Sequence, residues 1–186
     1  MTLSPFHDLA RQVLDQSVKD FEGLKQLGDR AIGQLPAQGF QWRPEPESNS
    51  IGIIIRHMSG NMISRWTDFL TSDGEKPYRN RDTEFEGFGE EDGAPASILA
   101  RWEQGWAVLL DTLRSLTPDD VLRTVTIRSE PHTVLQAIHR QIAHYGYHVG
   151  QIVYAAKAFQ SSNWQSLSIP KGGSEAFNRQ RSEERR

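Results

Sequence analysis

Hydrophobic residues recur at steps of three and four positions in four long stretches of the chain, which is the spacing of one buried face of a helix. Pro5 and Pro95 suit the first turns of two of these helices, and Thr133 with Gln136 forms a capping box before the last one. The pattern therefore predicts four helices, over residues 5–35, 50–70, 95–116 and 134–159.

The apolar face of each predicted helix includes large side chains suited to a shared core. Tryptophans at helical spacing are core residues far more often than parts of a cofactor site, so we assign them to packing. The residues expected in the core include Phe6, Leu9, Phe21, Ile54, Met58, Met62, Trp66, Leu99, Trp102, Trp106 and Tyr145.

The connections between these helices differ in character. Residues 72–94 are polar and rich in glycine, which predicts a long, partly ordered surface loop rather than a lid. Residues 123–129 alternate as a short strand does. Residues 1–178 are expected to form one domain, ordered to about Phe177, and residues 179–186 a disordered tail.

Four helices with long connections predict an all-α protein, a four-helix bundle with a short β excursion before the last helix. The length of 186 residues and the 37% hydrophobic content suit one domain with a real core. At a net charge of −3 the chain lacks the excess of basic residues that is typical of nucleic-acid-binding proteins. It also lacks an apolar run that would predict a signal peptide or a membrane span. The default expectation is a cytoplasmic protein.

Candidate chemistry is concentrated in histidines, since the sequence contains no cysteine to supply a thiolate ligand. His144 and His148 lie four residues apart on the last predicted helix, where two imidazoles share a face and can converge on one metal ion. The H-x-x-x-H spacing alone is a weak signal, because many such pairs are simply exposed or satisfied within a core.

A third imidazole is offered by His57, at the edge of the apolar face of the second helix. Asn61, Ser64 and Asp68 follow His57 along the same edge, and Gln141 and Gln151 accompany the histidine pair. We take Asn61, Arg65 and Gln151 as candidate catalytic residues. No carboxylate is evident as a general base, and Asp68 lies about three turns from His57. The histidines His7, His132 and His139 are expected to be solvated or capping.

Two strings on these helices, I-I-R-H-M-S-G-N-M-I-S-R-W and H-Y-G-Y-H-V-G-Q-I-V-Y, resemble the DinB/YfiT-like superfamily of candidate metalloenzymes. The likeness is greatest to a branch described as a domain of unknown function. It covers most of the chain, including D-F-L-T-S-D-G-E-K-P-Y-R-N-R-D and the later L-S-I-P-K-G-G-S-E-A-F-N.

The resemblance implies a bundle that holds one divalent ion, zinc or nickel, through His57, His144 and His148. It also implies thiol-dependent S-transferase or isomerase chemistry on a small-molecule substrate with a low-molecular-weight thiol, and a homodimer. Three neutral imidazoles leave an open position on the ion, as in catalytic sites. The alternatives are a metal-dependent hydrolase, a non-catalytic metal-binding or stress-associated protein, and histidines that only fill polar gaps.

Arg65 lies within the apolar face of the second helix, where a guanidinium is rarely buried without a partner. It is either paired with an acidic residue at the edge of the core or directed at a substrate. The segment after the last helix is expected to fold back on the bundle as far as about Phe177. Lys171 on this segment is then either solvated or brought to the open end of the metal site, where it would join Arg65. The two cations would then favour an anionic substrate such as a carboxylate-bearing thiol.

Overall fold

A computed structural model describes residues 4–184 of the chain. In this part of the chain there are five α-helices, one two-stranded sheet and four short 3-10 helices. The elements are α1 (Pro5–Ile32), η1 (Ala37–Phe40), α2 (Ile51–Trp66), η2 (Asp82–Phe85), α3 (Pro95–Ser115), η3 (Pro118–Asp120), β1 (Thr124–Ile127), β2 (Glu130–Thr133), α4 (Val134–Gln160), η4 (Ser161–Asn163) and α5 (Ser174–Glu183). The predicted helical character and the short β excursion are both confirmed.

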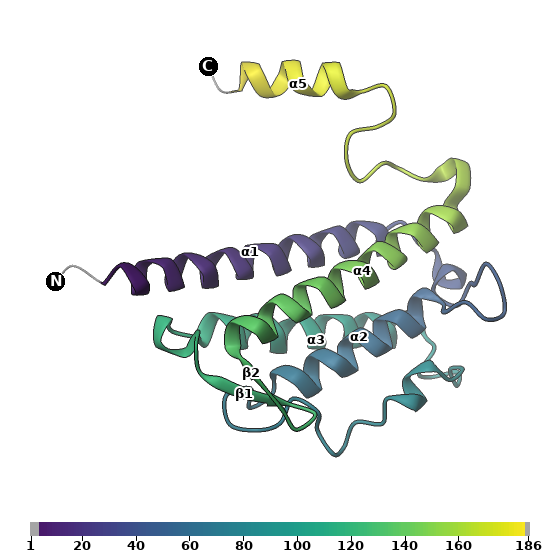
Figure 1. Cartoon of the computed structure of the whole chain (residues 1–186). Coiled ribbons are helices and arrows are strands. Elements are labelled where there is room, and N and C mark those ends of the chain that lie inside the picture. The colour runs from purple at the N-terminus through teal and green to yellow at the C-terminus, as the bar shows by residue number, and fades with distance from the viewer. Residues whose placement is uncertain (1–3, 185–186) are drawn as a thin grey trace.

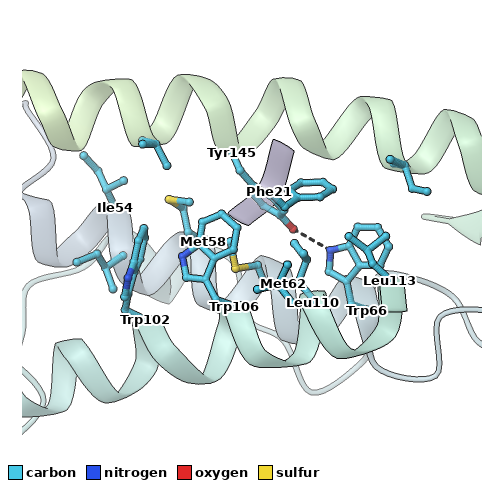
Figure 2. Packing of buried hydrophobic residues seen from close by; sticks show 14 of the residues in the cluster. Phe21, Ile54, Met58, Met62, Trp66, Trp102, Trp106, Leu110, Leu113 and Tyr145 are labelled. Carbon is cyan, nitrogen blue, oxygen red and sulfur yellow. Dashed lines mark hydrogen bonds between the residues drawn. The ribbon is translucent and has the colours of Figure 1, made fainter. Parts of the chain in front are cut away.

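The four long helices α1 to α4 pack around one hydrophobic core (Figure 1). Helices α1 and α2 each pack against both α3 and α4. Figure 2 shows the centre of this core, where Phe21, Trp66, Trp106 and Tyr145 meet from all four helices. The tryptophan assignment to packing is therefore confirmed for Trp66, Trp102 and Trp106, which are all fully buried.

Three residues expected in the core are exposed instead. Phe6 and Leu9 lie on the N-terminal turns of α1, which extend beyond the ends of α3 and α4 (Figure 1), so no facing helix covers them. Leu99 is on the outer side of the first turns of α3. Periodicity placed Phe6 and Leu9 on the apolar face of α1 but carries no information about where a neighbouring helix ends, and it set the apolar face of α3 one residue too wide at Leu99.

Helix α2 begins as predicted and ends four residues earlier than expected. The Ser50 hydroxyl caps its start by accepting a hydrogen bond from the Ile53 amide. At its end Thr67 is extended and Asp68 has a φ of 48°, so the chain turns away after Trp66. The Ser64 carbonyl, left without a helical partner, accepts a hydrogen bond from Lys76 Nζ at 3.0 Å.

The predicted strand at residues 123–129 is confirmed as β1, which pairs antiparallel with β2. Arg128 and Ser129 form the turn between them, both with positive φ. The Asp73 carboxylate accepts hydrogen bonds from both of their amides, at 2.9 and 2.8 Å. Gly74 adds a backbone bond to Thr126. The hairpin is thus tied to the first residues of the 72–94 loop, at the end of the molecule where that loop leaves α2.

The segment after α4 returns to the helices only in part. Trp164 and Leu167 pack on the core, and Arg30 Nη1 donates to the Leu167 carbonyl at 2.8 Å. Beyond that point Lys171 and Phe177 are exposed, and α5 lies apart from the other helices (Figure 1). The expectation that this segment folds back as far as Phe177 is wrong, because too few apolar side chains follow Leu167 to bury a helix.

The domain boundary at residue 178 stays a prediction. Residues up to Glu183 are helical, and none of the described residues of α5 is buried. Of the tail expected to be disordered, residues 185 and 186 lie outside the described part of the chain. Within residues 4–184, no helix is both long and apolar enough to cross a membrane.

Candidate metal centre

Three histidines from two helices come together at the surface of the core. His57 lies on α2, and His144 and His148 lie one turn apart on α4. One ring nitrogen from each lies within 4.8 Å of one from each of the others. The ring centroids are 5.5 Å apart for His57 and His144, 4.9 Å for His57 and His148, and 4.8 Å for the α4 pair. Three nitrogens at this spacing could hold one metal ion.

His57 is oriented by a carboxylate from the 72–94 loop. Its Nδ1 lies 2.8 Å from Glu84 Oε2, so the Nδ1 proton is donated to Glu84 and Nε2 is left as the candidate ligand. Arg79 donates to both oxygens of the same carboxylate, at 2.7 and 2.9 Å. Phe85, next to Glu84, packs on the His57 ring with centroids 4.8 Å apart. A buried Arg–Glu–His chain therefore fixes the ring.

The close approach of Glu84 to α2 depends on Gly60. A Cβ at this position would lie 2.4 Å from Glu84 Oε1, closer than any real contact, so an alanine would displace the carboxylate. Burial acts to raise the pKa of Glu84, but the hydrogen bonds from His57 and Arg79 outweigh burial and lower that pKa. With a lowered pKa and both oxygens engaged in hydrogen bonds, Glu84 is a weak base, better suited to orient His57 than to remove a proton from a substrate.

His148 is oriented from within α4. Its Nδ1 lies 2.8 Å from the Gln151 side-chain oxygen, which can only accept, so Nδ1 carries the proton and Nε2 the lone pair. That Nε2 is buried and has no hydrogen-bond partner among the described residues. Nδ1 of His144 is likewise buried without a partner there. Unpaired nitrogens in a buried site cost free energy, and a bound cation would satisfy them.

Burial keeps the two imidazoles of α4 neutral. Burial, helped by the neighbouring charges of His148 and His57, lowers the pKa of His144 to about 3. Burial also lowers the pKa of His148 to about 4, although the Gln151 hydrogen bond opposes the shift. Neutral imidazole is the form that binds metal, so His144 and His148 can accept a cation near neutral pH without first losing protons. The residues present therefore fit a divalent ion.

A pocket of about 370 Å³ opens beside the histidines. His57 and His144 lie on its wall together with Asn61, Gln141 and Arg65. The remaining lining residues come from the 72–94 loop, the hairpin turn and α4, and are Arg79, Arg81, Arg128, Arg140, Ala143 and Tyr147. A ligand in this pocket would therefore contact two of the three candidate metal ligands, His57 and His144, directly.

Of the polar residues that the sequence placed beside the histidines, only some line the pocket. The Asn61 side-chain oxygen accepts from the Tyr145 hydroxyl at 2.8 Å, which links the pocket to the core. Gln151 contacts His148 but does not line this pocket. Ser64 is buried and bonds the Gly74 carbonyl and the Lys76 amide, while Asp68 is exposed. Ser64 and Asp68 are thus structural or solvated rather than part of the site.

The three remaining histidines lie elsewhere, as expected. His139 is exposed, His132 contacts the Glu130 carbonyl, and His7 pairs with Asp119 at 2.9 Å. Lys171 is exposed on the segment before α5 and does not line the pocket. Of the two alternatives for Lys171, the solvated one is confirmed and the approach to the site is not, because the chain folds back only as far as Leu167.

Sequence reasoning missed the carboxylate and its arginine. Glu84 and Arg79 lie in the loop that showed no usable periodicity, about 27 residues from His57 in the case of Glu84. The available signal was local: Glu84 is followed by Phe85, and an apolar residue in a polar loop indicates a point where the loop contacts the core. The 72–94 loop is therefore partly ordered, as predicted, and also supplies part of the site.

Comparison with known proteins adds one finding. Residues 8–173 match the model of a family described as "Protein of unknown function (DUF1572)". None of the curated proteins searched matches the chain. The match covers α1 from its fourth residue, all of α2, α3 and α4, and the three histidines of the candidate site.

Proposed function

The chain belongs to the DUF1572 family of proteins of unknown function, and from its site we propose that it is a metal-dependent enzyme acting on a small molecule. In this proposal His57, His144 and His148 hold one divalent ion, zinc or nickel, in a four-helix bundle of the DinB/YfiT-like kind. One observation carries the proposal: one ring nitrogen from each of the three histidines lies within 4.8 Å of the others, beside a pocket of about 370 Å³.

The number and type of ligands favour a catalytic site over a structural one. Structural zinc sites usually present four protein ligands, whereas catalytic sites keep one position open for substrate. Here three imidazoles are supplied, and no cysteine exists in the sequence to complete a closed set. When bound, the ion would supply Lewis-acid activation that lowers the pKa of a coordinated water or thiol.

The residues around the histidines have distinct tasks in this proposal. Glu84 and Gln151 hold the rings of His57 and His148 in the tautomer with a lone pair on Nε2. Asn61 uses its oxygen to accept from Tyr145, which leaves its amide NH₂ group to donate to a substrate in the pocket. Asn61 is therefore a positioning candidate, and Gln151 acts through His148.

The reaction that best suits this set of residues is thiol transfer. Glu84 is ionised and engaged by Arg79 and His57, so it is poorly suited to remove a proton from water as a hydrolase base would. In thiol transfer the sulfur forms a bond to an electrophilic carbon, the bond from that carbon to its leaving group breaks, and the thiol proton departs with the leaving group. The homodimer suggested by the superfamily likeness belongs to the same proposal.

Activity of metal-loaded protein tests the proposal. The protein would be incubated with zinc or nickel, then with thiols such as cysteine or 2-mercaptosuccinate and an alkylating electrophile, and thioether formation measured by mass spectrometry. His144→Ala should abolish the reaction, while His139→Ala, on an exposed part of the same helix, should not. A protein that binds metal at these histidines but accelerates no transfer would instead be a non-catalytic metal-binding protein.

A further inference from the structure

Arginine dominates the pocket beside the three histidines. Of the eleven described residues that line it, five are arginines and none is acidic. They come from four separate parts of the chain, so their proximity results from the fold and not from a basic run in the sequence. The arginines are Arg65 on α2, Arg79 and Arg81 in the loop, Arg128 in the hairpin turn and Arg140 on α4.

Arg65 is the unusual member of this group, because only 3% of its surface is exposed. Its Nε and Nη1 are buried and have no hydrogen-bond partner among the described residues. The nearest carboxylate is Glu75, at 3.9 Å from Nη2, beyond hydrogen-bonding distance. A guanidinium taken out of water without full pairing is costly, and such a group in a cavity is typical of a binding site.

Room for Arg65 is made by a glycine. A Cβ on Gly74 would lie 2.8 Å from both Cδ and Nη1 of Arg65, so any side chain there would push the guanidinium aside. The expectation that Arg65 pairs with an acidic residue at the edge of the core describes only part of this arrangement. Glu75 is near, but two other arginines are nearer to it.

The acidic groups around the pocket do not balance the arginines. Glu75 Oε2 is shared between Arg128 at 3.2 Å, Arg79 at 3.7 Å and Arg65 at 3.9 Å. Glu84 is occupied by Arg79 and His57. Burial is the main cause that lowers the pKa of Arg65; Tyr145 and Glu75 oppose this shift, and the charges of Arg140 and Arg79 add to it. An anion in the pocket would relieve this repulsion.

We propose that this pocket binds the oxyanion groups, carboxylate or phosphate, of a small multiply charged substrate whose reacting end reaches His57 and His144 on the pocket wall. Arginine binds either group with two parallel hydrogen bonds, so guanidiniums from several directions would orient such a molecule as well as hold it. The inference rests on the proposed function for the role of the metal, but anion binding itself requires no metal.

Equilibrium binding to metal-free protein tests the pocket. Inorganic phosphate and succinate would each be titrated by calorimetry at constant low ionic strength into chelator-treated protein, with acetate as a singly charged comparison. Removal of the metal matters because an ion could itself bind phosphate. We expect phosphate or succinate to bind more tightly than acetate, and the tighter of the two identifies the favoured oxyanion.

Arginine variants assign the binding to this site. Arg65→Met should weaken binding by about tenfold or more, since it removes a buried charged donor. Arg140→Gln should weaken it by about threefold to tenfold. Arg140 is exposed, so this variant keeps its fold even if Arg65→Met does not. Arg43→Gln, which removes an exposed arginine outside the pocket, should change the affinity by less than about twofold.

The outcomes separate this inference from the proposed function. If phosphate or succinate binds the metal-free protein and only the pocket variants weaken it, the inference stands even when the protein proves to bind no metal. If none of the anions binds at about 10 mM, or if Arg43→Gln weakens binding as much as Arg140→Gln does, the pocket is not an anion site. Metal content of the same preparations tests the histidine site separately.

Discussion

The contact between Glu84 and His57 allows the role of the loop in metal binding to be tested by a single change of charge. In Glu84→Gln the side chain keeps its length and an oxygen that can accept from His57 Nδ1, but it loses its negative charge. The imidazole then becomes a poorer electron donor at Nε2. One acceptor for Arg79 is also lost, since Arg79 now donates to both carboxylate oxygens.

The expected size of the effect follows from the role of such acceptors. Removing a carboxylate that accepts from a metal-binding histidine typically lowers metal affinity by about 10- to 100-fold. Because the amide oxygen of the Glu84→Gln variant would still accept one hydrogen bond from His57, we expect the lower limit, about tenfold, or about 1.4 kcal/mol. Unfolding free energy should fall separately, by up to about 3 kcal/mol, because the buried Arg79 loses its charged partner.

The assay is competition for zinc against a coloured chelator at about pH 7.5, on folded protein at a temperature well below the unfolding midpoint. Glu75→Gln is the matched control, because Glu75 pairs with Arg79, Arg128 and Arg65 but contacts no histidine. It should lose stability and keep its zinc affinity within about twofold. Equal zinc affinity in Glu84→Gln and the parent would refute the orienting role and leave Glu84 a partner of Arg79 alone.

The same geometry leads to three further predictions. Gly60→Ala should lower zinc affinity in the same competition assay, because its Cβ would displace Glu84. Gly146→Ala is the control: its Cβ would have no neighbouring atom within 4 Å, so zinc affinity should stay unchanged, and the free energy of unfolding should rise by up to about 1 kcal/mol. Chelation should lower the thermal midpoint but keep the helical circular dichroism at room temperature, since the core is built without the metal; a chelated sample without helical signal would contradict this. The urea midpoint of the metal-free protein should fall as the pH drops below about 6.5. In the folded protein the pKa of His144 is lowered to about 3 and that of His148 to about 4, so the unfolded chain binds protons at a higher pH than the folded one does. A urea midpoint that stays constant between about pH 7 and pH 5 would contradict this prediction.

The helices could be predicted because they depend on local spacing, and local spacing also offered the histidines as candidates, although the choice of all three as one ligand set came from the superfamily resemblance. His144 and His148 lie one helical turn apart, and His57 lies at the edge of an apolar face, so the fold needed only to bring two helix edges together. The capping box at Thr133 and the strand at 123–129 were equally local, and the structure contains both.

The arginine pocket and the carboxylate could not be predicted in the same way. Glu84, Arg79 and Arg128 lie in loops and turns, where position is determined by contacts distant in sequence and not by periodicity. The Asp73 carboxylate, for example, holds the hairpin turn that carries Arg128 beside the loop that carries Arg79. The prediction that the tail folds back to Phe177 failed for a related reason, because apolar residues in a tail do not reveal how far the tail stays attached to the core.

The central claim is most directly tested by the metal content of the purified protein, measured by mass spectrometry after growth with added zinc or nickel and extensive dialysis. We predict about one divalent ion per chain in the parent and in His139→Ala. His57→Ala, His144→Ala and His148→Ala should each lose most of it while remaining helical. Retention of the ion in all three of these variants, or a folded parent protein that takes up no divalent ion at all, would contradict the metal centre.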